Sequence, residues 1–326
     1  MRRREFVAGL GAQCIAWPSR TYAETRSEVR RIAVWVAGTE QGRSNPPTIK
    51  RRLEELGWAE DRNLHIVVRA WTGDAGAMRS QAEELLASQP EVVVVVSNPA
   101  LAILKPIAGS VPIVFAMVAA PVGSGFIANL AHPGGNITGF TNFEPSMGGK
   151  WLDVLKEAAP NMTRVLALMH PETPVHTALW QTIKASAATL NMEATASGVH
   201  DAAEIERAIS DFAAAPNGGV IALPHVVTEV HSDLIIALAK QNRLPSIFAF
   251  PNHASAGALV AYGVDQNDLI RRTADYVDRI LRGAKPSDLP VQAPNIFDLT
   301  INLATAKALG LTIPPSLVAR ADKVIE

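Results

Sequence analysis

The chain is almost without cysteine, since its 326 residues include a single one, Cys14. That residue lies in an apolar stretch near the N-terminus, and no second thiol is present to pair with it. An intramolecular disulfide and a multi-thiolate metal site are therefore excluded. If the segment that contains Cys14 is removed, a thiolate nucleophile is excluded as well.

Signatures of catalysis and of nucleotide binding are missing too. There is no Gly-x-Ser-x-Gly nucleophile elbow, and Gly134-Gly135 lacks the Gly-x-Gly-x-x-Gly spacing of a dinucleotide site. Four histidines of the second half form no His-x-x-x-His pair, which favours separate surface and loop-end residues over a zinc site. They are His170, His176, His225 and His231. We therefore expect no enzyme activity, no metal and no cofactor.

Charge of one sign is also scarce, because the formal net charge is −1 and no block of like charges occurs. A chain without a basic face is a poor partner for nucleic acid.

What is present is a composition of 48% hydrophobic and 19% charged residues, typical of a globular protein with sizeable cores. At about 150 residues per domain, the length predicts two domains.

The N-terminus has the order of a secretory signal: basic, apolar, then small residues. Arg3-Arg4-Glu5-Phe6 resembles a twin-arginine signal, the apolar run from Val7 to Trp17 is too short to span a bilayer, and Ala23 is a suitable cleavage site. We expect residues 1–23 to be removed and the mature protein to be periplasmic. Loss of four arginines and one glutamate lowers the net charge from −1 to −4. Lipidation at Cys14 stays open, although Gln13 fits a lipobox poorly.

Short apolar runs alternate with amphipathic stretches along the whole chain. In the first half, strands are predicted at 32–36, 64–71, 92–96, 111–116 and 137–140, with helices over 46–56, 75–86 and 98–107. In the second half, helices are predicted at 146–158, 174–190, 202–212, 228–241 and 269–281, with strands at 164–169, 192–196, 219–223, 245–248, 257–265 and 297–301. Repeated β/α units predict parallel sheets covered by helices on both faces.

In parallel sheets, ligands bind beyond the carboxyl ends of the strands. This rule selects the polar and apolar residues that follow each predicted strand. In the first half they are Thr39, Glu40, Ser97, Asn98 and Met117, and in the second half Glu172, Thr173 and His225. For Ser97 and Asn98 an equally good alternative is a helix cap before Pro99.

The stretch Pro133-Gly134-Gly135-Asn136-Ile137-Thr138-Gly139 predicts a sharp turn followed by a strand. We interpret it as the first crossing between two lobes, and the alternative is an ordinary loop within one large sheet. Together with several pieces of the C-terminal part, it resembles the ABC-transporter substrate-binding proteins related to tryptophan- and tyrosine-type binding proteins. Those pieces are Asn242-Arg243-Leu244-Pro245, Tyr262-Gly263, Ile280 to Pro286, Asp288 to Val291, Ile301-Asn302-Leu303 and Ala306 to Leu311.

The resemblance implies a type I periplasmic-binding fold, with two Rossmann-like lobes and three crossings. Lobe 1 is then 24–141 plus 252–285, lobe 2 is 142–251 plus 286–326, and the later crossings fall near Phe248–Pro251 and Lys285–Val291. Residues at these crossings and strand ends join the candidate site. They are Phe143, Phe248, Tyr262 and Asp265.

The function implied by the resemblance is capture of a small molecule, amino-acid-like or aromatic, for an ABC permease. A monomer that closes on its ligand by hinge motion is expected, and a ligand sensor for a signalling partner is the alternative. One departure bears on the ligand: family members often carry Gly-Asp-Pro where this chain has Ala119-Ala120-Pro121. An acidic ligand contact at position 120 is therefore absent here.

Overall fold

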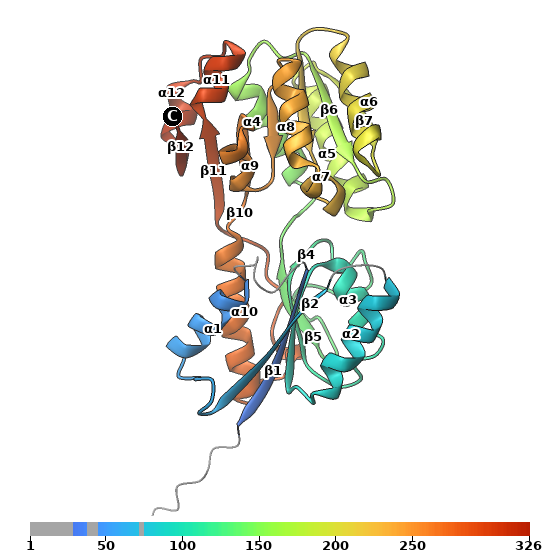
Figure 1. The fold of residues 1–326 in the computed structure, drawn as a ribbon, viewed down its shortest axis with the longest axis vertical. Helices are drawn as coiled ribbons and strands as arrows, with labels where there is room; N and C mark the ends of the chain where they lie inside the picture. The colour runs from blue at the N-terminus through green and yellow to red at the C-terminus, as the bar shows by residue number, and fades with distance from the viewer. Residues whose placement is uncertain (1–28, 38–44, 72–74) are drawn as a thin grey trace, which may run out of the picture.

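The computed structural model describes residues 29–37, 45–71 and 75–326. The predicted signal segment with Cys14, and the candidates Thr39 and Glu40, lie outside the described residues. The described chain forms two α/β lobes, drawn one above the other in Figure 1 and linked by several crossing segments.

Lobe 1 is built on a five-stranded parallel sheet of order β2-β1-β3-β4-β5. Its strands are β1 (Arg30–Ala37), β2 (Leu64–Trp71), β3 (Val92–Val96), β4 (Ile113–Val118) and β5 (Ile137–Thr141). Every residue of β3 is buried, as a run of valines predicts for a central strand covered on both faces.

Helices cover both faces of this sheet because successive side chains of a strand point to opposite sides. Ile32 and Val34 pack on the face covered by α1 (Asn45–Glu55) and α10 (Gln266–Leu281). Trp35 packs on the other face, under α2 (Ala75–Ala87) and α3 (Asn98–Leu104). Helix α10 thus returns to lobe 1 from far along the chain.

Lobe 2 is built on a seven-stranded sheet of order β12-β11-β10-β9-β8-β6-β7, parallel except for the antiparallel pair β10–β11. Its strands are β6 (Arg164–Met169), β7 (Glu193–Gly198), β8 (Gly218–Ala222), β9 (Ser246–Phe248), β10 (Val260–Val264), β11 (Phe297–Asn302) and β12 (Lys323–Ile325). The edge strand β7 has few apolar side chains and is mostly exposed.

The larger helices of lobe 2 form a layer on each face of its sheet. The core on one face includes α4 (Met147–Ala158) and α5 (Pro174–Thr189), and the other includes α6 (Ala202–Ala213) and α8 (Ser232–Gln241). The short helices of lobe 2 are α7 (Val226–Val230), α9 (Pro251–Ala256), α11 (Leu303–Leu309) and α12 (Pro315–Ala319), whereas η2 (Pro286–Asp288) packs against β5 of lobe 1.

The chain crosses between the lobes at residues 142–146, at Asp265 and at residues 293–296. The later two crossings differ from the expected positions. Residues 252–264 belong to lobe 2, because β10 pairs with β9 and α9 returns the chain to that sheet. Residues up to Gln292 belong to lobe 1, because the backbone of Gln292 hydrogen-bonds Gly139 and Thr141 of β5.

The turn Pro133 to Asn136 is not itself a crossing. It is a loop inside lobe 1 that leads into β5, which pairs with β4, so the ordinary-loop alternative describes it. The last glycine of this stretch, Gly139, is required by packing, because a Cβ there would lie 2.0 Å from the Phe115 carbonyl oxygen. Only glycine lets β5 approach β4 this closely at φ 152°.

Three local expectations of secondary structure also change. The helix expected at 228–241 is two helices, α7 and α8, which meet at His231. Both α9 and β12 were missed, since each is only a few residues long and lacks a periodic apolar pattern. The segment 121–130, where the sequence after the fourth strand predicts a loop and a short helix, forms turns.

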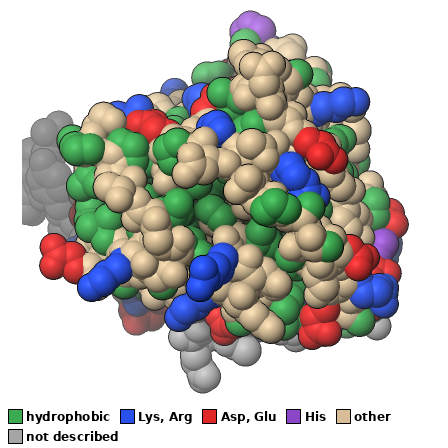
Figure 2. All heavy atoms as spheres, turned by 90° about the horizontal axis from the view of Figure 1, so that it is seen from above, with side chains coloured by type: hydrophobic (Ala, Val, Ile, Leu, Met, Phe, Trp, Pro, Cys, Tyr) green, Lys and Arg blue, Asp and Glu red, His purple; other side chains and the backbone are tan. Residues whose placement is uncertain are grey.

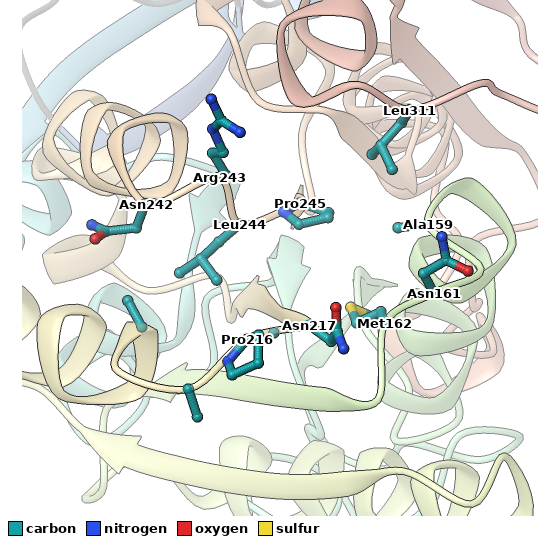
Figure 3. A pocket seen from close by; sticks show the side chains of 13 residues that line it. Ala159, Asn161, Met162, Pro216, Asn217, Asn242, Arg243, Leu244, Pro245 and Leu311 are labelled. Carbon is teal, nitrogen blue, oxygen red and sulfur yellow. The ribbon is translucent and has the colours of Figure 1, made fainter.

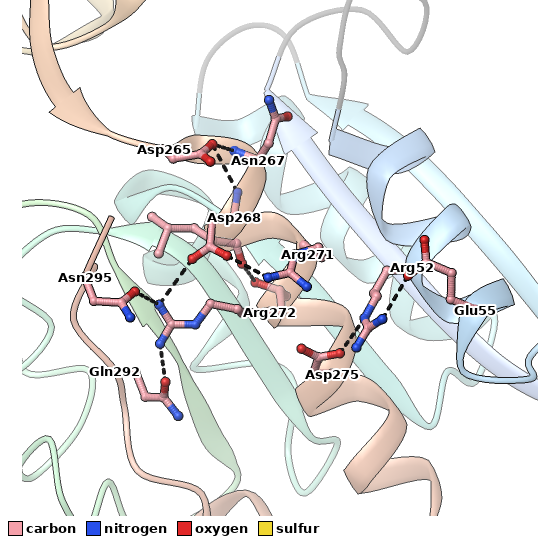
Figure 4. Close-up of polar contacts among 12 residues, drawn as sticks. Arg52, Glu55, Asp265, Asn267, Asp268, Arg271, Arg272, Asp275, Gln292 and Asn295 are labelled. Atoms are coloured by element: carbon pink, nitrogen blue, oxygen red, sulfur yellow. Dashed lines mark hydrogen bonds and ion pairs between the residues drawn. The ribbon is translucent and has the colours of Figure 1, made fainter. Parts of the chain in front are cut away.

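One arginine of α10 ties the third crossing to lobe 1 (Figure 4). Arg272 contacts Asp268 at 3.5 Å, donates to the Asn295 Oδ1 at 2.9 Å and also donates to the Gln292 side chain. Its guanidinium lies over the Phe140 ring at 5.0 Å. Asp265, at the second crossing, caps α10 by accepting the Asn267 N–H at 2.8 Å. The crossings are therefore anchored at one end of α10.

Candidate functional site

The carboxyl ends of β3, β4 and β5 in lobe 1 and of β6, β8 and β9 in lobe 2 point toward the other lobe (Figure 1). This arrangement follows from the crossings, because the chain leaves β5 and β10 at these same ends. The two facing edges are where a doubly wound α/β architecture binds ligands. We call them the lobe 1 edge and the lobe 2 edge.

The lobe 1 edge carries strained backbone. Ser97, directly after β3, has φ 91° and ψ 156°, a region that is essentially restricted to glycine. Met117 has φ 56° and forms a bulge in β4, where the register with β5 shifts, and Ala120 has φ 44°. Three strained non-glycine residues on two neighbouring strand ends are typical of a functional site.

Asn98 braces this edge instead of capping a helix. Its Nδ2 donates to the Ala119 carbonyl oxygen at 2.8 Å, and its Oδ1 accepts the Ala119 N–H at 2.9 Å. Ser97 occupies the N-cap position of α3, and its side chain makes no capping hydrogen bond. The bidentate amide therefore fixes the loop after β4 to the end of β3, and it presents the backbone of Ala119 and Ala120 at the edge.

Two hydroxyls at the ends of lobe 1 strands lack hydrogen-bond partners. Within the described residues, the buried Ser97 Oγ and the buried Thr141 Oγ1 have none. Buried hydroxyls are normally satisfied, so such exceptions need a reason. A ligand that engages them after a side-chain rotation would supply one.

The lobe 2 edge gathers histidines and carboxylates. His170 follows β6, His200 follows β7 and His225 follows β8, and their loops meet because these strands are neighbours. The His170 ring stacks on His225 with centroids 4.0 Å apart and lies 5.2 Å from His200. Glu172 reaches both the His200 Nε2 at 3.1 Å and the His170 Nδ1 at 3.3 Å. The expectation of dispersed histidines was wrong, since spacing in the sequence does not reveal which loops share an edge.

His176 has a structural role in this cluster. Its Nδ1 accepts the His170 N–H at 2.9 Å, and its Nε2 lies 3.2 Å from the Pro224 carbonyl oxygen. Burial lowers the pKa of His176, so it is neutral and holds the two loops together. Burial, followed by the charges of His170 and His176, lowers the pKa of His225 to about 4. The His225 Nδ1 accepts the Val227 N–H at 3.2 Å and so caps α7.

The expected candidates in lobe 2 come together only in part. Glu172 and His225 lie in the histidine cluster, and the Thr173 Oγ1 is 3.3 Å from the His170 Nδ1. Phe248 is a core residue of lobe 2, with 3% of its surface exposed. His200 and Glu204 were missed because the end of β7 was not included among the strand ends searched.

The candidates at the crossings have mainly structural contacts. Phe143 packs on Trp151 and Phe250, with ring centroids 5.8 and 5.9 Å away. Tyr262 stacks on Phe297 at 6.0 Å, and burial raises the pKa of its hydroxyl. Of these rings, Phe250, Tyr262 and Phe297 are partly exposed. Phe250, which the sequence also offers near the expected crossings as a candidate apolar wall, lies beside Phe143 at the first crossing.

A pocket of about 320 Å³ lies away from both edges, among the loops that precede β6, β8 and β9. Met162, Leu244 and Leu311 contribute apolar side chains, and Asn217 and Arg243 contribute polar ones (Figure 3). Figure 2 looks down on this end of lobe 2 and shows hydrophobic side chains around a hollow near its centre. Because the pocket lies at the amino ends of the strands, it is not the expected ligand position for this fold.

None of the helices in the described ranges is both long enough and apolar enough to span a bilayer.

The family model for ABC transporter substrate-binding proteins matches residues 43–325. The chain belongs to this family. A tyrosine-binding protein of Clostridioides difficile is 24% identical over 265 residues, which covers 80% of this chain and 75% of the relative. The resemblance noted in the sequence is therefore confirmed, and the family is one of substrate-binding proteins.

Solved structures agree on the fold. A conserved domain protein from Vibrio cholerae is 26% identical with a TM-score of 0.81, covering 91% of this chain and 100% of that one. A domain from Streptococcus pneumonia crystallised with L-Trp is 23% identical with a TM-score of 0.81, covering 91% and 99%. The predicted architecture of two α/β lobes with parallel sheets, in a periplasmic-binding-protein fold, is confirmed.

Proposed function

We propose that this protein is an extracytoplasmic solute-binding protein that delivers an aromatic amino acid to an ABC permease. Membership of the substrate-binding family supports the binding role. The ligand class is suggested by one relative that is named for tyrosine and another that was crystallised with L-Trp. Export through the N-terminal signal would bring the protein to the outer face of its membrane.

The observation that supports a ligand site on the lobe 1 edge is the strain at Ser97, Met117 and Ala120. A fold that needed these loops only as connections would have no reason to hold three non-glycine residues at positive φ. The brace from Asn98 to Ala119 holds this geometry in place before any ligand arrives. Preorganised contacts of this kind favour affinity, because little freedom is lost on binding.

The proposed contacts divide between the two sides. On lobe 1, the Ser97 hydroxyl and the backbone of Ala120, which the Asn98 brace on Ala119 holds in place, hydrogen-bond the polar end of the ligand. Phe250 and the side chain of Met117, both partly exposed, contribute the apolar surface that small-molecule sites use. On lobe 2, Thr173 and His225 approach when the lobes close about the crossings.

The test is calorimetric titration of the processed protein, freed of bound ligand by unfolding and refolding, with L-Trp, L-Tyr and the control D-Trp. Ser97→Ala should weaken binding about ten- to hundredfold, since a ligand group left unpaired costs about 1–3 kcal/mol. Phe212→Leu, in the core on the outer side of lobe 2, is the matched control and should leave affinity unchanged. Lack of binding to either aromatic amino acid would remove this ligand class.

The alanine at position 120 gives a sharper expectation about the ligand's amine. Because no carboxylate stands there, the amine gains less than an acidic contact would provide, so indole-3-propionate should compete with L-Trp. Competition measured by displacement of bound L-Trp checks this. Complete indifference to the deaminated analogue would show that another residue recognises the amine.

Export and closure are tested separately. Cell fractionation with intact-mass analysis should find the protein outside the cytoplasm with the N-terminal segment removed. Small-angle scattering should show a smaller radius of gyration at saturating ligand. Full-length protein in the cytoplasm would contradict export, and an unchanged radius would contradict closure.

A further inference from the structure

The histidine cluster on the lobe 2 edge has a part that the proposed ligand site does not need. Strand β7 is the outermost strand of the sheet, and the crossings are on the side of β10 and β11. His200, which follows β7, is therefore at the rim of the edge. Its side chain is 47% exposed, and that of Glu172 is 65% exposed, so an ion in solution can reach both.

Three side chains at this rim have the composition and spacing of a metal-binding set. The His170 Nδ1, one Glu172 carboxylate oxygen and the His200 Nε2 all lie within 4.8 Å of one another. The two histidine–carboxylate contacts are 3.3 and 3.1 Å. Metal–nitrogen bonds of about 2.0–2.1 Å place neighbouring ligand atoms of a tetrahedron roughly 3.3 Å apart. Two of the three ligand-atom pairs therefore already have the spacing of a tetrahedral site.

A second carboxylate faces the other ring nitrogen of His200. Glu204 Oε2 lies 2.8 Å from the His200 Nδ1 and also accepts the His200 N–H at 2.8 Å. The Glu204 backbone is fixed in turn, because the Asp201 side chain caps α6 through the Glu204 N–H at 2.8 Å. A proton held on Nδ1 leaves the Nε2 lone pair free, which is the arrangement of carboxylate–histidine–metal sites.

His170 is oriented just as firmly. Its ring lies against His225 with an interplanar angle of 21°, and the Thr173 Oγ1 is 3.3 Å from its Nδ1. The Thr173 hydroxyl can rotate away from Nδ1, and the single lone pair of that nitrogen is then available on the side where Glu172 stands. Both histidines therefore turn a ring nitrogen toward the same carboxylate.

Such an arrangement requires a positive occupant between Nε2 of His200 and the Glu172 oxygens, because lone pairs and a carboxylate repel each other at 3.1 Å. A proton on His200 is one occupant and a metal ion is the other. The two imidazoles favour the borderline transition metals over Mg²⁺ or Ca²⁺, which prefer oxygen ligands.

We propose that His170, Glu172 and His200 bind a divalent transition-metal ion of the zinc class, with Glu204 as the outer carboxylate that orients His200. Two histidines and one carboxylate supply three ligands, and the fourth position is open toward water or toward a group of a bound molecule. His170 contacts Thr173 and His225, which are proposed for the aromatic ligand on lobe 2, whereas the lobe 1 contacts lie apart from the metal site. Variants of His200 and of Ser97 therefore distinguish the two proposals.

The test uses the full processed protein without an affinity tag, stripped with EDTA and dialysed. Zn²⁺ is titrated by calorimetry, and Co²⁺ is titrated by its visible absorption, which is intense for tetrahedral sites and weak for octahedral hydrated ions. We expect one ion per chain and a tetrahedral cobalt spectrum. Absence of saturable binding, or a spectrum of hydrated cobalt only, would overturn the proposal.

Variants separate a built site from loose surface binding. His200→Ala and Glu172→Gln should abolish saturable binding, and Glu204→Gln should weaken it by about ten- to hundredfold, as outer carboxylates do. His132→Ala, an exposed histidine of lobe 1, is the matched control and should bind as the unchanged protein does. Equal effects of His132→Ala and His200→Ala, or no effect of Glu204→Gln, would contradict the site.

A final arm keeps the two proposals distinguishable. L-Trp titrations with EDTA and with saturating Zn²⁺ report the aromatic ligand, while the cobalt spectrum reports the metal. Loss of the cobalt signal in His200→Ala with unchanged L-Trp binding would support the metal proposal alone. Loss of L-Trp binding in Ser97→Ala with an intact cobalt spectrum would support the aromatic ligand alone.

Discussion

The two facing edges are built by different means. The described part of the lobe 1 edge uses neutral residues and backbone geometry, with Ser97, Met117 and Ala120 at positive φ and Asn98 as a brace. The lobe 2 edge uses ionisable side chains, among them His170, Glu172 and His200. Backbone geometry is tied to the fold, whereas exposed charged side chains can be exchanged with little effect on it. Changes at the first edge should therefore affect stability and binding together, and changes at the second should affect binding alone.

The largest effect is expected at Asn98. Asn98→Ala removes both hydrogen bonds to Ala119, whose surface is only 6% exposed. Each buried backbone group left unpaired costs about 1–3 kcal/mol, so for the two groups we expect a loss of about 2–6 kcal/mol in the free energy of unfolding. Urea denaturation measures this loss, and affinity for L-Trp should fall as well.

Asn98→Asp is the control for the brace, since it keeps the acceptor for the Ala119 N–H and loses the donor. An intermediate loss is expected. A stability of Asn98→Ala equal to that of the unchanged protein would mean that the lobe 1 edge does not depend on this brace, and the contrast between the edges would lose its main support.

Ser97→Gly should act in the opposite direction on stability. Glycine adopts φ 91° and ψ 156° freely, which relieves strain of about 1–3 kcal/mol, while its extra freedom when unfolded offsets about 0.5–1 kcal/mol. We expect a net gain of about 1 kcal/mol with weaker ligand binding. Thermal unfolding and L-Trp titration of one sample measure both, and a stability decrease would show that Ser97 is not strained.

A smaller effect on stability is expected at Asp298, which lies in β11 directly after the third crossing. Burial, followed by the charges of Asp265 and Asp322, raises the pKa of the Asp298 carboxyl above its ordinary value. Its ionised form is therefore disfavoured in the folded state, and the penalty is full above the raised pKa and absent below the unfolded one. Asp298→Asn should raise the melting temperature slightly at neutral pH and leave it unchanged in strong acid.

A gain that persisted unchanged in strong acid would rule out charge as the cause. Asp288→Asn is a control, because this residue in η2 lies on lobe 1 away from β11. It should show no comparable gain at neutral pH.

The smallest effect on stability is expected at Glu172. Its side chain is 65% exposed, and water and salt screen ion pairs of exposed side chains, so they contribute little to stability. Glu172→Gln should change the metal-free melting temperature hardly at all, although it removes a proposed metal ligand. A large destabilisation would mean that the lobe 2 edge, like the lobe 1 edge, is part of the structural framework.

The helices and strands could be predicted from the sequence because each is encoded by a short run of neighbouring residues. The valine run of β3 and the apolar faces of α4 and α10 each predict one element from a few neighbouring residues. The second crossing was misplaced because α9 spans only six residues, too few for a periodic pattern. The order of strands within a sheet decides where a crossing falls, and no local pattern encodes it.

The candidate site followed only in outline. The strand-end rule placed Ser97, Met117 and Glu172 at the facing edges, but it could not show the strain or the Asn98 brace. These depend on how two strand ends pack against each other. His200 joins Glu172 only because β7 lies beside β6, a neighbourhood that is invisible in the separation of the two residues along the chain.

Helix α10 also has a consequence for how the protein is made. It covers one face of the lobe 1 sheet, and its contacts with the α1 region join residues more than 200 positions apart, as in the bond between Arg52 and Asp275. A ribosome therefore releases the five strands of lobe 1 long before the helix that shields them. The apolar surface of these strands stays uncovered by α10 until most of lobe 2 has been synthesised. Such delayed closure slows folding and leaves the nascent chain dependent on chaperones that hold exposed apolar surface.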